Sequence, residues 1–286
     1  MHKINQFSPQ DNKFFQIITT IADTPQKLYY MGTLPDIRKP AVAIVGTRKP
    51  TKYGVEVTHR LAYDLAKKGV VIISGMALGV DGLAHRAALE AGGATIAVLG
   101  NGLNEFYPST HRQLAADILA KGGAIISEFE PETPAYPANF LQRNRIVSGL
   151  SDAIIITEAA RRSGTLNTAG HALEQNKDIF VVPGNITSPL SAGCNALLRQ
   201  GATPVTSADD ILEIIAPQLL QPQTSLALGE NPLQTKIIQL LQSGIRDGDQ
   251  LLQELATDSK AFATELTMME IGGTIRNLGA NQWTLK

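Results

Sequence analysis

The chain has very little cysteine and no long apolar segment. Its 286 residues include one cysteine, Cys194. A single thiol excludes an intrachain disulfide and a cysteine cluster for zinc, and it agrees with a reducing compartment. No stretch approaches the roughly 18 apolar residues of a membrane-spanning helix, and the first residues lack the apolar run of a signal peptide. We therefore expect a cytoplasmic protein without membrane insertion.

The chain also lacks an excess of either charge and any set of metal ligands. It has 25 Lys and Arg against 26 Asp and Glu, so a nucleic-acid partner requires a local basic patch. His59, His111 and His171 are scattered without metal-ligand spacing, and we predict no metal and no cofactor. Asp81 and His85 lie one helical turn apart but have no convincing nucleophile beside them, so a structural role is favoured over catalysis.

Short, β-branched apolar runs alternate with amphipathic stretches along most of the chain. Such runs are typical of strands buried on both faces, and the alternation predicts an α/β fold with a parallel sheet and helices on both sides. Ligands are expected at the carboxyl ends of the strands. The expected strands cover residues 41–45, 70–74, 94–99, 124–127, 153–157 and 179–182.

Composition divides the chain into four parts. Residues 1–38 predict a short preamble, helical over 14–21 and packed on the core, and residues 39–216 form the Rossmann-like domain. Residues 217–231 resemble a linker, and residues 232–286 predict three helices and a hairpin, which suggests a winged-helix module. From Pro217 onward, the chain has five Lys and Arg residues and seven Asp and Glu residues. This negative balance disfavours binding of duplex DNA by this module and favours protein contact or regulation.

Polar and glycine residues follow the expected strands. Tight turns explain the glycines, but they do not explain Arg48 in the first turn or Arg143 and Arg145 near a helix. Cations at the beginning of a helix face an unfavourable dipole unless an anion is nearby, which favours a phosphate site. Glu158 is expected to pair with Arg143 or Arg145, or to accept hydrogen bonds from a base or a ribose. The turns are Gly46-Thr47-Arg48, Ser74-Gly75, Thr157-Glu158, Ser163-Gly164-Thr165 and Pro183-Gly184-Asn185.

These segments occur in the order seen in a known family. Residues 25–215 resemble the DNA-processing protein A (DprA, also called Smf) family, and the length of the match makes the resemblance specific. Leu141 departs from it, since the family usually has proline there. The matching segments are Val45-Gly-Thr-Arg48, Ser74-Gly-Met-Ala-Leu-Gly-Val-Asp81, Tyr107-Pro108, Ser127-Glu128, Asn139-Phe140, Arg143-Asn-Arg145, Glu158, Ser163-Gly-Thr165 and Pro183-Gly184.

The resemblance implies a function and a set of site residues. It implies an extended Rossmann-like fold that binds single-stranded DNA, protects DNA imported during natural transformation and loads the recombinase RecA. It also implies a homodimer without enzymatic activity. The implied single-stranded DNA site comprises Gly46, Thr47, Arg48, Lys49, Ser74, Gly75, Phe140, Arg143, Asn144, Arg145, Ser163, Gly164 and Thr165, with Phe140 stacking on a base. Supporting residues are Asp81, Glu158, Gly184 and Asn185.

Two other functions stay open. A nucleotide-binding enzyme of the phosphoribohydrolase-like Rossmann group shares a glycine–threonine turn and a glutamate, but here Glu158 precedes Ser163-Gly-Thr165 rather than following it. A nucleotide sensor can use the same pocket. For the dimer, apolar residues near Ile211, Leu212, Ile214 and Ile215 are the expected surface.

Overall fold

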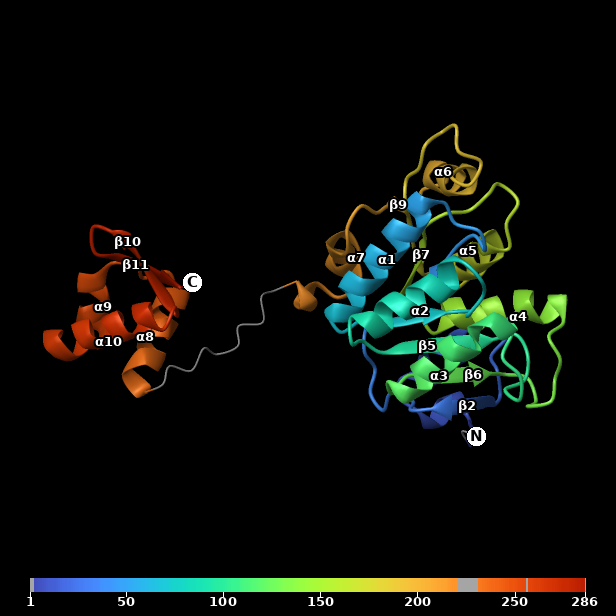
Figure 1. The fold of residues 1–286 in the computed structure, drawn as a ribbon, viewed down its shortest axis with the longest axis horizontal. Coiled ribbons are helices and arrows are strands. Elements are labelled where there is room, and N and C mark those ends of the chain that lie inside the picture. The colour runs from blue at the N-terminus through green and yellow to red at the C-terminus, as the bar shows by residue number, and fades with distance from the viewer. Residues whose placement is uncertain (1–2, 221–230, 256, 286) are drawn as a thin grey trace. The chain divides into compact units, whose positions relative to one another are not determined.

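The computed structural model describes residues 3–220, 231–255 and 257–285. The chain divides into two compact units, Met1–Leu220 and Gln221–Lys286 (Figure 1). Most of the expected linker, residues 221–230, lies outside the described residues. None of the described helices is long and apolar enough to cross a membrane.

The first unit is built on a nine-stranded sheet with the order β1-β2-β6-β5-β4-β3-β7-β8-β9. In this order, the seven strands from β6 through β3 to β9 are parallel to one another. The strand β2 pairs antiparallel with β6, and β1 pairs antiparallel with β2. The predicted α/β class with a mostly parallel sheet is confirmed. The strands are β1 Asn5–Phe7, β2 Leu28–Gly32, β3 Ala41–Val45, β4 Val71–Ser74, β5 Thr95–Leu99, β6 Ala124–Ser127, β7 Ala153–Ile156, β8 Asp178–Val181 and β9 Thr203–Pro204.

Helices cover both faces of this sheet, and every residue of β3, β4, β5, β6 and β7 is buried between them. Alternate strand residues therefore enter opposite cores, which explains the uninterrupted apolar runs. One face packs against η2 Phe15–Thr20, α4 Pro137–Gly149, α5 Thr165–Glu174 and α6 Ala192–Arg199. The other packs against α1 Lys52–Lys67, α2 Val80–Glu90, α3 Arg112–Ala120 and α7 Ala208–Ile215.

The strand order reverses beside β3. From β3 the chain runs through β4 and β5 to β6 in one direction, and then returns to β7 on the opposite side of β3 before continuing to β8 and β9. At such a switch point the loops after the two neighbouring strands diverge, which leaves a crevice at their carboxyl ends. The loop after β3 carries Arg48. The loop after β7 carries Ser163-Gly164, directly before Thr165 at the beginning of α5.

The first 38 residues differ from the expected helical preamble. They contribute β1 and β2 to the sheet, and the expected helix over 14–21 is a 3₁₀ segment, η2. Phe14, Phe15 and Ile18 are fully buried in the core beside α4. The strand-forming run Leu28-Tyr-Tyr-Met31 was the missed sequence signal, because aromatic and branched residues favour a strand there.

The second unit has a core of its own, which includes Ile237, Leu251, Phe262 and Trp283. It contains three helices followed by an antiparallel hairpin, as the sequence patterns indicate. The elements are α8 Pro232–Gln242, α9 Gly248–Leu255, α10 Ser259–Ile271, β10 Ile275–Gly279 and β11 Gln282–Leu285.

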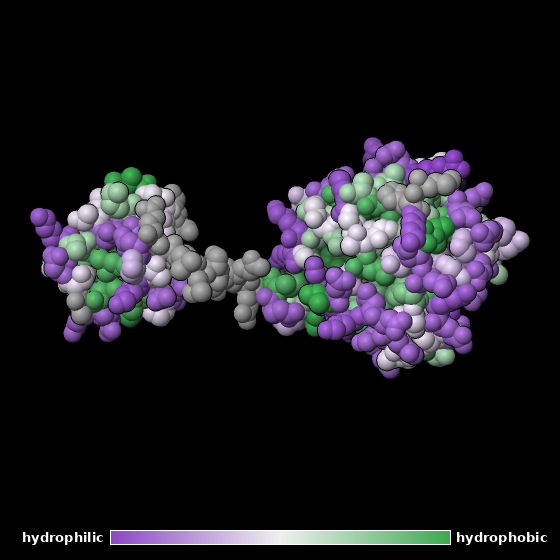
Figure 2. Space-filling view, turned by 90° about the horizontal axis from the view of Figure 1, so that it is seen from below, coloured by the Kyte–Doolittle hydropathy of each residue, from purple (hydrophilic) through white to green (hydrophobic). Residues whose placement is uncertain are grey.

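The expected dimer surface is largely unavailable. Ile211 and Leu212 are fully buried core residues of α7, so that prediction is wrong for both. Ile215 is partly buried against the same core, whereas Ile214 is 51% exposed. On the face shown in Figure 2, apolar residues lie in several separate groups among polar ones on each unit.

Candidate functional site

A cavity of about 210 Å³ lies at the switch point of the sheet. Its walls come from the loop after β3, the loop after β4, helix α4 and the beginning of α5. The lining residues include Gly46, Thr47, Arg48, Ala77, Asp81, Phe140, Leu141, Arg143, Asn144, Ser163, Gly164, Thr165 and Thr168. Nine of the thirteen predicted binding residues therefore meet here: all except Lys49, Ser74, Gly75 and Arg145.

The loop after β3 is held close to β7. The Thr47 N–H donates to the Glu158 carbonyl at 2.8 Å. A side chain at Gly46 would place its Cβ 2.7 Å from Val80 and 2.9 Å from the same carbonyl, so this approach requires glycine. The Arg48 side chain is exposed at the cavity and makes no ion pair within the described residues.

Glu158 does not pair with an arginine, contrary to expectation. Its two carboxylate oxygens accept hydrogen bonds from the Thr51 hydroxyl at 2.6 Å and from the Thr51 N–H at 2.8 Å. The hydroxyl in turn caps α1 by accepting from the Gly54 N–H. The glutamate is 2% exposed, and its bonds to Thr51 fix the end of the Arg48 loop.

Arg143 is buried but keeps part of its guanidinium at the cavity. Its Nη1 donates to the carbonyls of Gly75, at 2.6 Å, and Val98. Its Nε donates to the Asn144 side chain at 3.3 Å. Its Nη2 makes no hydrogen bond within the part of the chain that the structure describes. The residue lines the cavity, so that nitrogen can donate to a ligand.

Burial changes the ionisation of Arg143 and of the acid near it. Loss of solvent lowers the pKa of Arg143 to about 10, against the opposing effect of Asp81, so the guanidinium is charged at neutral pH. Burial has the opposite effect on the acid and raises the pKa of Asp81. Arg143 and the N–H groups of Gly75 and Ala77 act against this shift, because they favour the charged carboxylate. Asp81 makes no hydrogen bond to Arg143 among the described residues, so a phosphate at the cavity could accept directly from the guanidinium.

Ser74 and Gly75 support the site from beneath. The Ser74 hydroxyl is fully buried and donates to the Ile44 carbonyl at 2.7 Å, so it is not available to a ligand. A Cβ on Gly75 would lie 2.5 Å from the Arg143 Nη1, so glycine is required for the guanidinium to pack here. The predicted direct phosphate contact is therefore wrong for Ser74.

Arg145 lies outside the cavity. Its guanidinium donates to both Glu128 carboxylate oxygens, at 2.8 and 2.7 Å, and to Asp23 at 2.8 Å. Residues two apart on a helix point about 200° apart, so Arg143 and Arg145 cannot share one pocket. In addition α4 begins at Pro137, so neither arginine is at its beginning and the dipole argument does not apply. The placement of Arg145 beside Arg143 in one pocket is corrected accordingly.

The turn before α5 presents hydroxyls and an amide side chain. The Ser163 hydroxyl donates to the Thr165 hydroxyl at 3.0 Å, and it accepts from the Thr165 N–H at 3.2 Å. Asn144 donates to Asn167 at 3.1 Å, which ties α4 to α5 beside the cavity. A helix N-terminus with hydroxyls is a favourable place for a phosphate oxygen.

The remaining predicted residues lie around a second hollow or at the rim. Gly184 and Asn185 line a hollow of about 390 Å³ with Thr51, Tyr53 and Glu158, and this hollow shares no lining residue with the first cavity. Lys49 is exposed next to Arg48, but it does not line the first cavity.

Phe140 is more enclosed than a free stacking ring. It is half-buried, and a Cβ on Gly100 would come within 2.6 Å of it, so the ring packs against that strand end. The Arg143 guanidinium carbon lies 5.9 Å from its centroid, and the Tyr107 ring centroid lies 5.3 Å away. Tyr107 received no individual role from the sequence, although it belongs to one of the matching motifs.

His85 supports the fold. Because the Thr95 hydroxyl donates to the Ile72 carbonyl, His85 Nδ1 is the donor in its 2.6 Å contact with that hydroxyl. Burial lowers the pKa of His85 to about 3, so the ring is neutral. Among the residues that the structure describes, no group of three His, Cys, Asp or Glu side chains could hold a metal ion.

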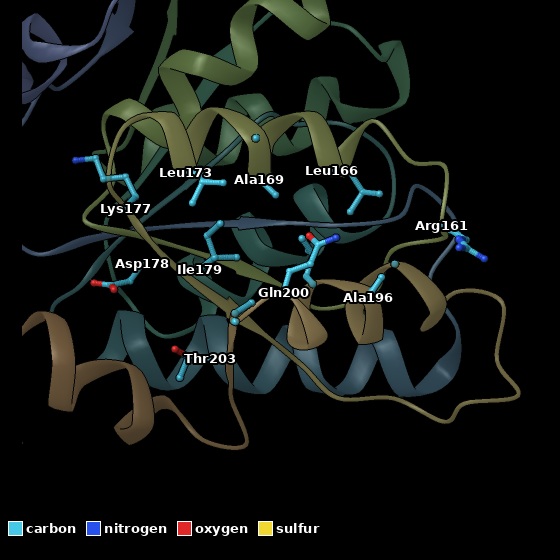
Figure 3. A pocket seen from close by; sticks show the side chains of 15 residues that line it. Arg161, Leu166, Ala169, Leu173, Lys177, Asp178, Ile179, Ala196, Gln200 and Thr203 are labelled. Carbon is cyan, nitrogen blue, oxygen red and sulfur yellow. The ribbon is translucent and has the colours of Figure 1, made fainter.

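A separate groove of about 580 Å³ runs between α5, α6 and the ends of β8 and β9. Figure 3 shows Leu166, Ala169 and Leu173 along one wall and Ala196 and Gln200 along the other. Apart from the charged residues at its ends, its walls are mostly apolar. None of the predicted site residues lines this groove.

Comparison with known proteins identifies the family. Residues 5–216 match the family described as DNA recombination-mediator protein A. The chain is 45% identical to protein Smf of Escherichia coli over 72% of its own length and 55% of that protein. It is 40% identical to the DNA processing protein DprA of Streptococcus pneumoniae over 73% of this chain and 74% of that one.

Two solved structures share the fold of the first unit. The structure of DprA from S. pneumoniae superposes with a TM-score of 0.69 at 38% identity, covering 74% of this chain and 75% of that one. The structure of DNA processing protein A from Helicobacter pylori, which is described for its single-stranded DNA binding mode, gives 0.66 at 34% identity and covers 76% and 97%. The chain thus spans only about half of the E. coli relative, but most of the H. pylori chain. The match over residues 5–216, together with these identities, shows that the chain belongs to the DNA recombination-mediator protein A family.

Proposed function

We propose that the first unit binds single-stranded DNA at the cavity beside β3, with Arg48 and Arg143 holding phosphate. The observation that carries this proposal is the pairing of an exposed Arg48 with the unoccupied Nη2 of a buried Arg143. Planar guanidinium groups hold phosphate oxygens well, and the Ser163–Thr165 turn adds hydroxyl and N–H donors at the same wall. The H. pylori relative, described for its single-stranded DNA binding, supports the choice of ligand.

Binding is favoured over catalysis by the state of the acids near the cavity. Glu158 has both carboxylate oxygens engaged by Thr51, and Asp81 accepts from the backbone of Gly75 and Ala77. Neither carboxylate is placed to take a proton from a substrate as a phosphoribohydrolase would need. We therefore propose that the protein has no enzymatic activity of this kind.

The test is a gel shift with oligo-dT at low salt. Arg48→Ala is expected to weaken binding and to reduce the slope of log affinity against log salt by about 0.7, because one phosphate contact on a single strand is lost. Lys67→Ala removes an exposed cation at the opposite end of α1, about 22 Å along the helix, and serves as the charge-matched control. Equal loss in both variants, or none in Arg48→Ala, would remove the site assignment.

We further propose that the protein acts as a cytoplasmic recombination mediator in natural transformation, protecting incoming DNA and loading RecA as a homodimer. The winged-helix assignment for the second unit is part of this proposal. Support comes from family membership and from the three-helix and hairpin order of that unit. For the subunit contact we place Leu173, 70% exposed at the apolar groove of Figure 3, in the interface. Sedimentation of Leu173→Glu as a dimer would exclude this surface.

A further inference from the structure

A second aromatic ring lies at the mouth of the proposed DNA site. Tyr107 comes from the loop between β5 and α3, whereas the phosphate-holding arginines come from the loop after β3 and from α4. A small cavity of about 40 Å³ brings Tyr107 together with Arg48, Phe140 and Arg143. The ring is therefore beside the cations although it is more than 30 residues from them in sequence.

The exposures of the two rings assign them different roles. Phe140 is half-buried between Gly100, the Arg143 guanidinium and Tyr107. The Tyr107 residue is 49% exposed, and its ring lies 5.3 Å from Phe140 at an interplanar angle of 35°. A base needs an open ring face, and Tyr107 has more free surface to offer.

Charge on the far side of Tyr107 selects which part of a nucleotide fits there. Tyr107 also lines a hollow of about 400 Å³ whose walls include the exposed Glu105 and Glu132. Arg112 also lines that hollow, so two carboxylates face one cation there. A phosphate on this side would meet net negative charge, whereas an uncharged base would not.

We infer that Tyr107 is the stacking surface for an unpaired base, with Phe140 as its support, beside the phosphate held by Arg48 and Arg143. This inference rests on the proposed function. It differs from the sequence prediction, which placed the base on Phe140. The stack would give affinity without sequence preference, because every base has an aromatic face.

The test separates base contacts from phosphate contacts. Binding of oligo-dT is compared with binding of an abasic oligonucleotide of the same length, which keeps the phosphates but lacks bases. Tyr107→Leu is expected to weaken oligo-dT binding about tenfold, within the range for one stacked base, and to leave binding of the abasic strand unchanged. Tyr107→Phe keeps the ring and is expected to bind both strands like the wild type.

Two variants complete the experiment. Arg48→Ala is expected to weaken both strands alike; if it does not, the proposed phosphate site fails, whatever Tyr107 does. Tyr63→Leu changes a partly exposed tyrosine of α1 that lines none of the hollows described above, and it is expected to leave both affinities unchanged. The stacking assignment alone would be overturned by wild-type oligo-dT affinity in Tyr107→Leu, by equal weakening of both strands in that variant, or by the same weakening in Tyr63→Leu.

Discussion

Replacing Arg145 with methionine separates a structural arginine from a binding one. Arg145 and Glu128 are nearly buried, with side-chain exposures of 8% and 12%, and they share two hydrogen bonds of 2.7–2.8 Å. Removing one partner of a buried pair leaves an uncompensated charge, at a cost of about 3–5 kcal/mol. The third bond, to the 72% exposed Asp23, adds at most about 1 kcal/mol.

The assay must report on the first unit. Trp283 is the only tryptophan and packs in the second unit, so its fluorescence follows the wrong part of the chain. Urea unfolding of Arg145→Met is therefore followed by circular dichroism, whose signal comes mostly from the first unit because that unit holds most of the helices and strands. The free energy of unfolding should fall by about 3–5 kcal/mol, while oligo-dT affinity measured below the unfolding transition stays at the wild-type value.

A double variant tests the cause. Adding Glu128→Gln to Arg145→Met removes the uncompensated carboxylate, so the double variant should be more stable than Arg145→Met alone. Loss of less than about 1 kcal/mol in Arg145→Met, or a loss of DNA affinity like that of Arg48→Ala, would refute the structural role.

Three further outcomes follow from the site and its supports. Burial lowers the pKa of His85 to about 3, whereas an unfolded histidine titrates near 6.5. The unfolded state therefore binds the extra proton first, and the free energy of unfolding should fall by up to about 1.4 kcal/mol per pH unit as the pH drops from about 6.5 toward 3. Urea titrations of His85→Gln should show a weaker dependence on pH, and a dependence equal to that of the wild type would contradict this explanation. Gly75→Ala should displace the Arg143 guanidinium, destabilise the fold by about 1–3 kcal/mol and weaken oligo-dT binding in gel shifts. Glu158→Ala removes both bonds to Thr51, so the melting temperature and oligo-dT affinity should both decrease; unchanged values would show that the Arg48 loop holds without it.

Local patterns in the sequence predicted the central strands of the sheet and the turns that carry Arg48, Arg143 and Ser163–Thr165, and the family resemblance supplied the rest of the site residues. The apolar runs identify strands because helices cover both faces, and parallel strands bring their carboxyl-end turns together. Arg48, Arg143 and the Ser163–Thr165 turn meet for this reason. The strands β1, β2 and β9 were missed. β1 and β9 have only three and two residues, and the four residues 28–31 of β2 include two tyrosines rather than an aliphatic run.

The partners of individual side chains could not be predicted in the same way. Arg145 binds acids that are 17 and 122 residues away in sequence, and only the folded chain brings them together. Two signals were nevertheless present: the spacing of two residues, which separates Arg143 from Arg145 on a helix, and Pro137, which is typical of the first helical position. The exposure of Tyr107 depends on how its loop packs, which no local pattern specifies.

The antiparallel β2 has a consequence for any shortened version of this protein. It hydrogen-bonds along the whole of β6, from Ala124 to Ser127, and β1 lies outside it. Cutting the chain just before β3 would leave β6 paired with β5 alone, with its other edge exposed, and would remove the Asp23 carboxylate that Arg145 binds. An unpaired strand edge can pair with a strand from another molecule, so such truncated proteins should self-associate and precipitate even though Arg48 and Arg143 are retained.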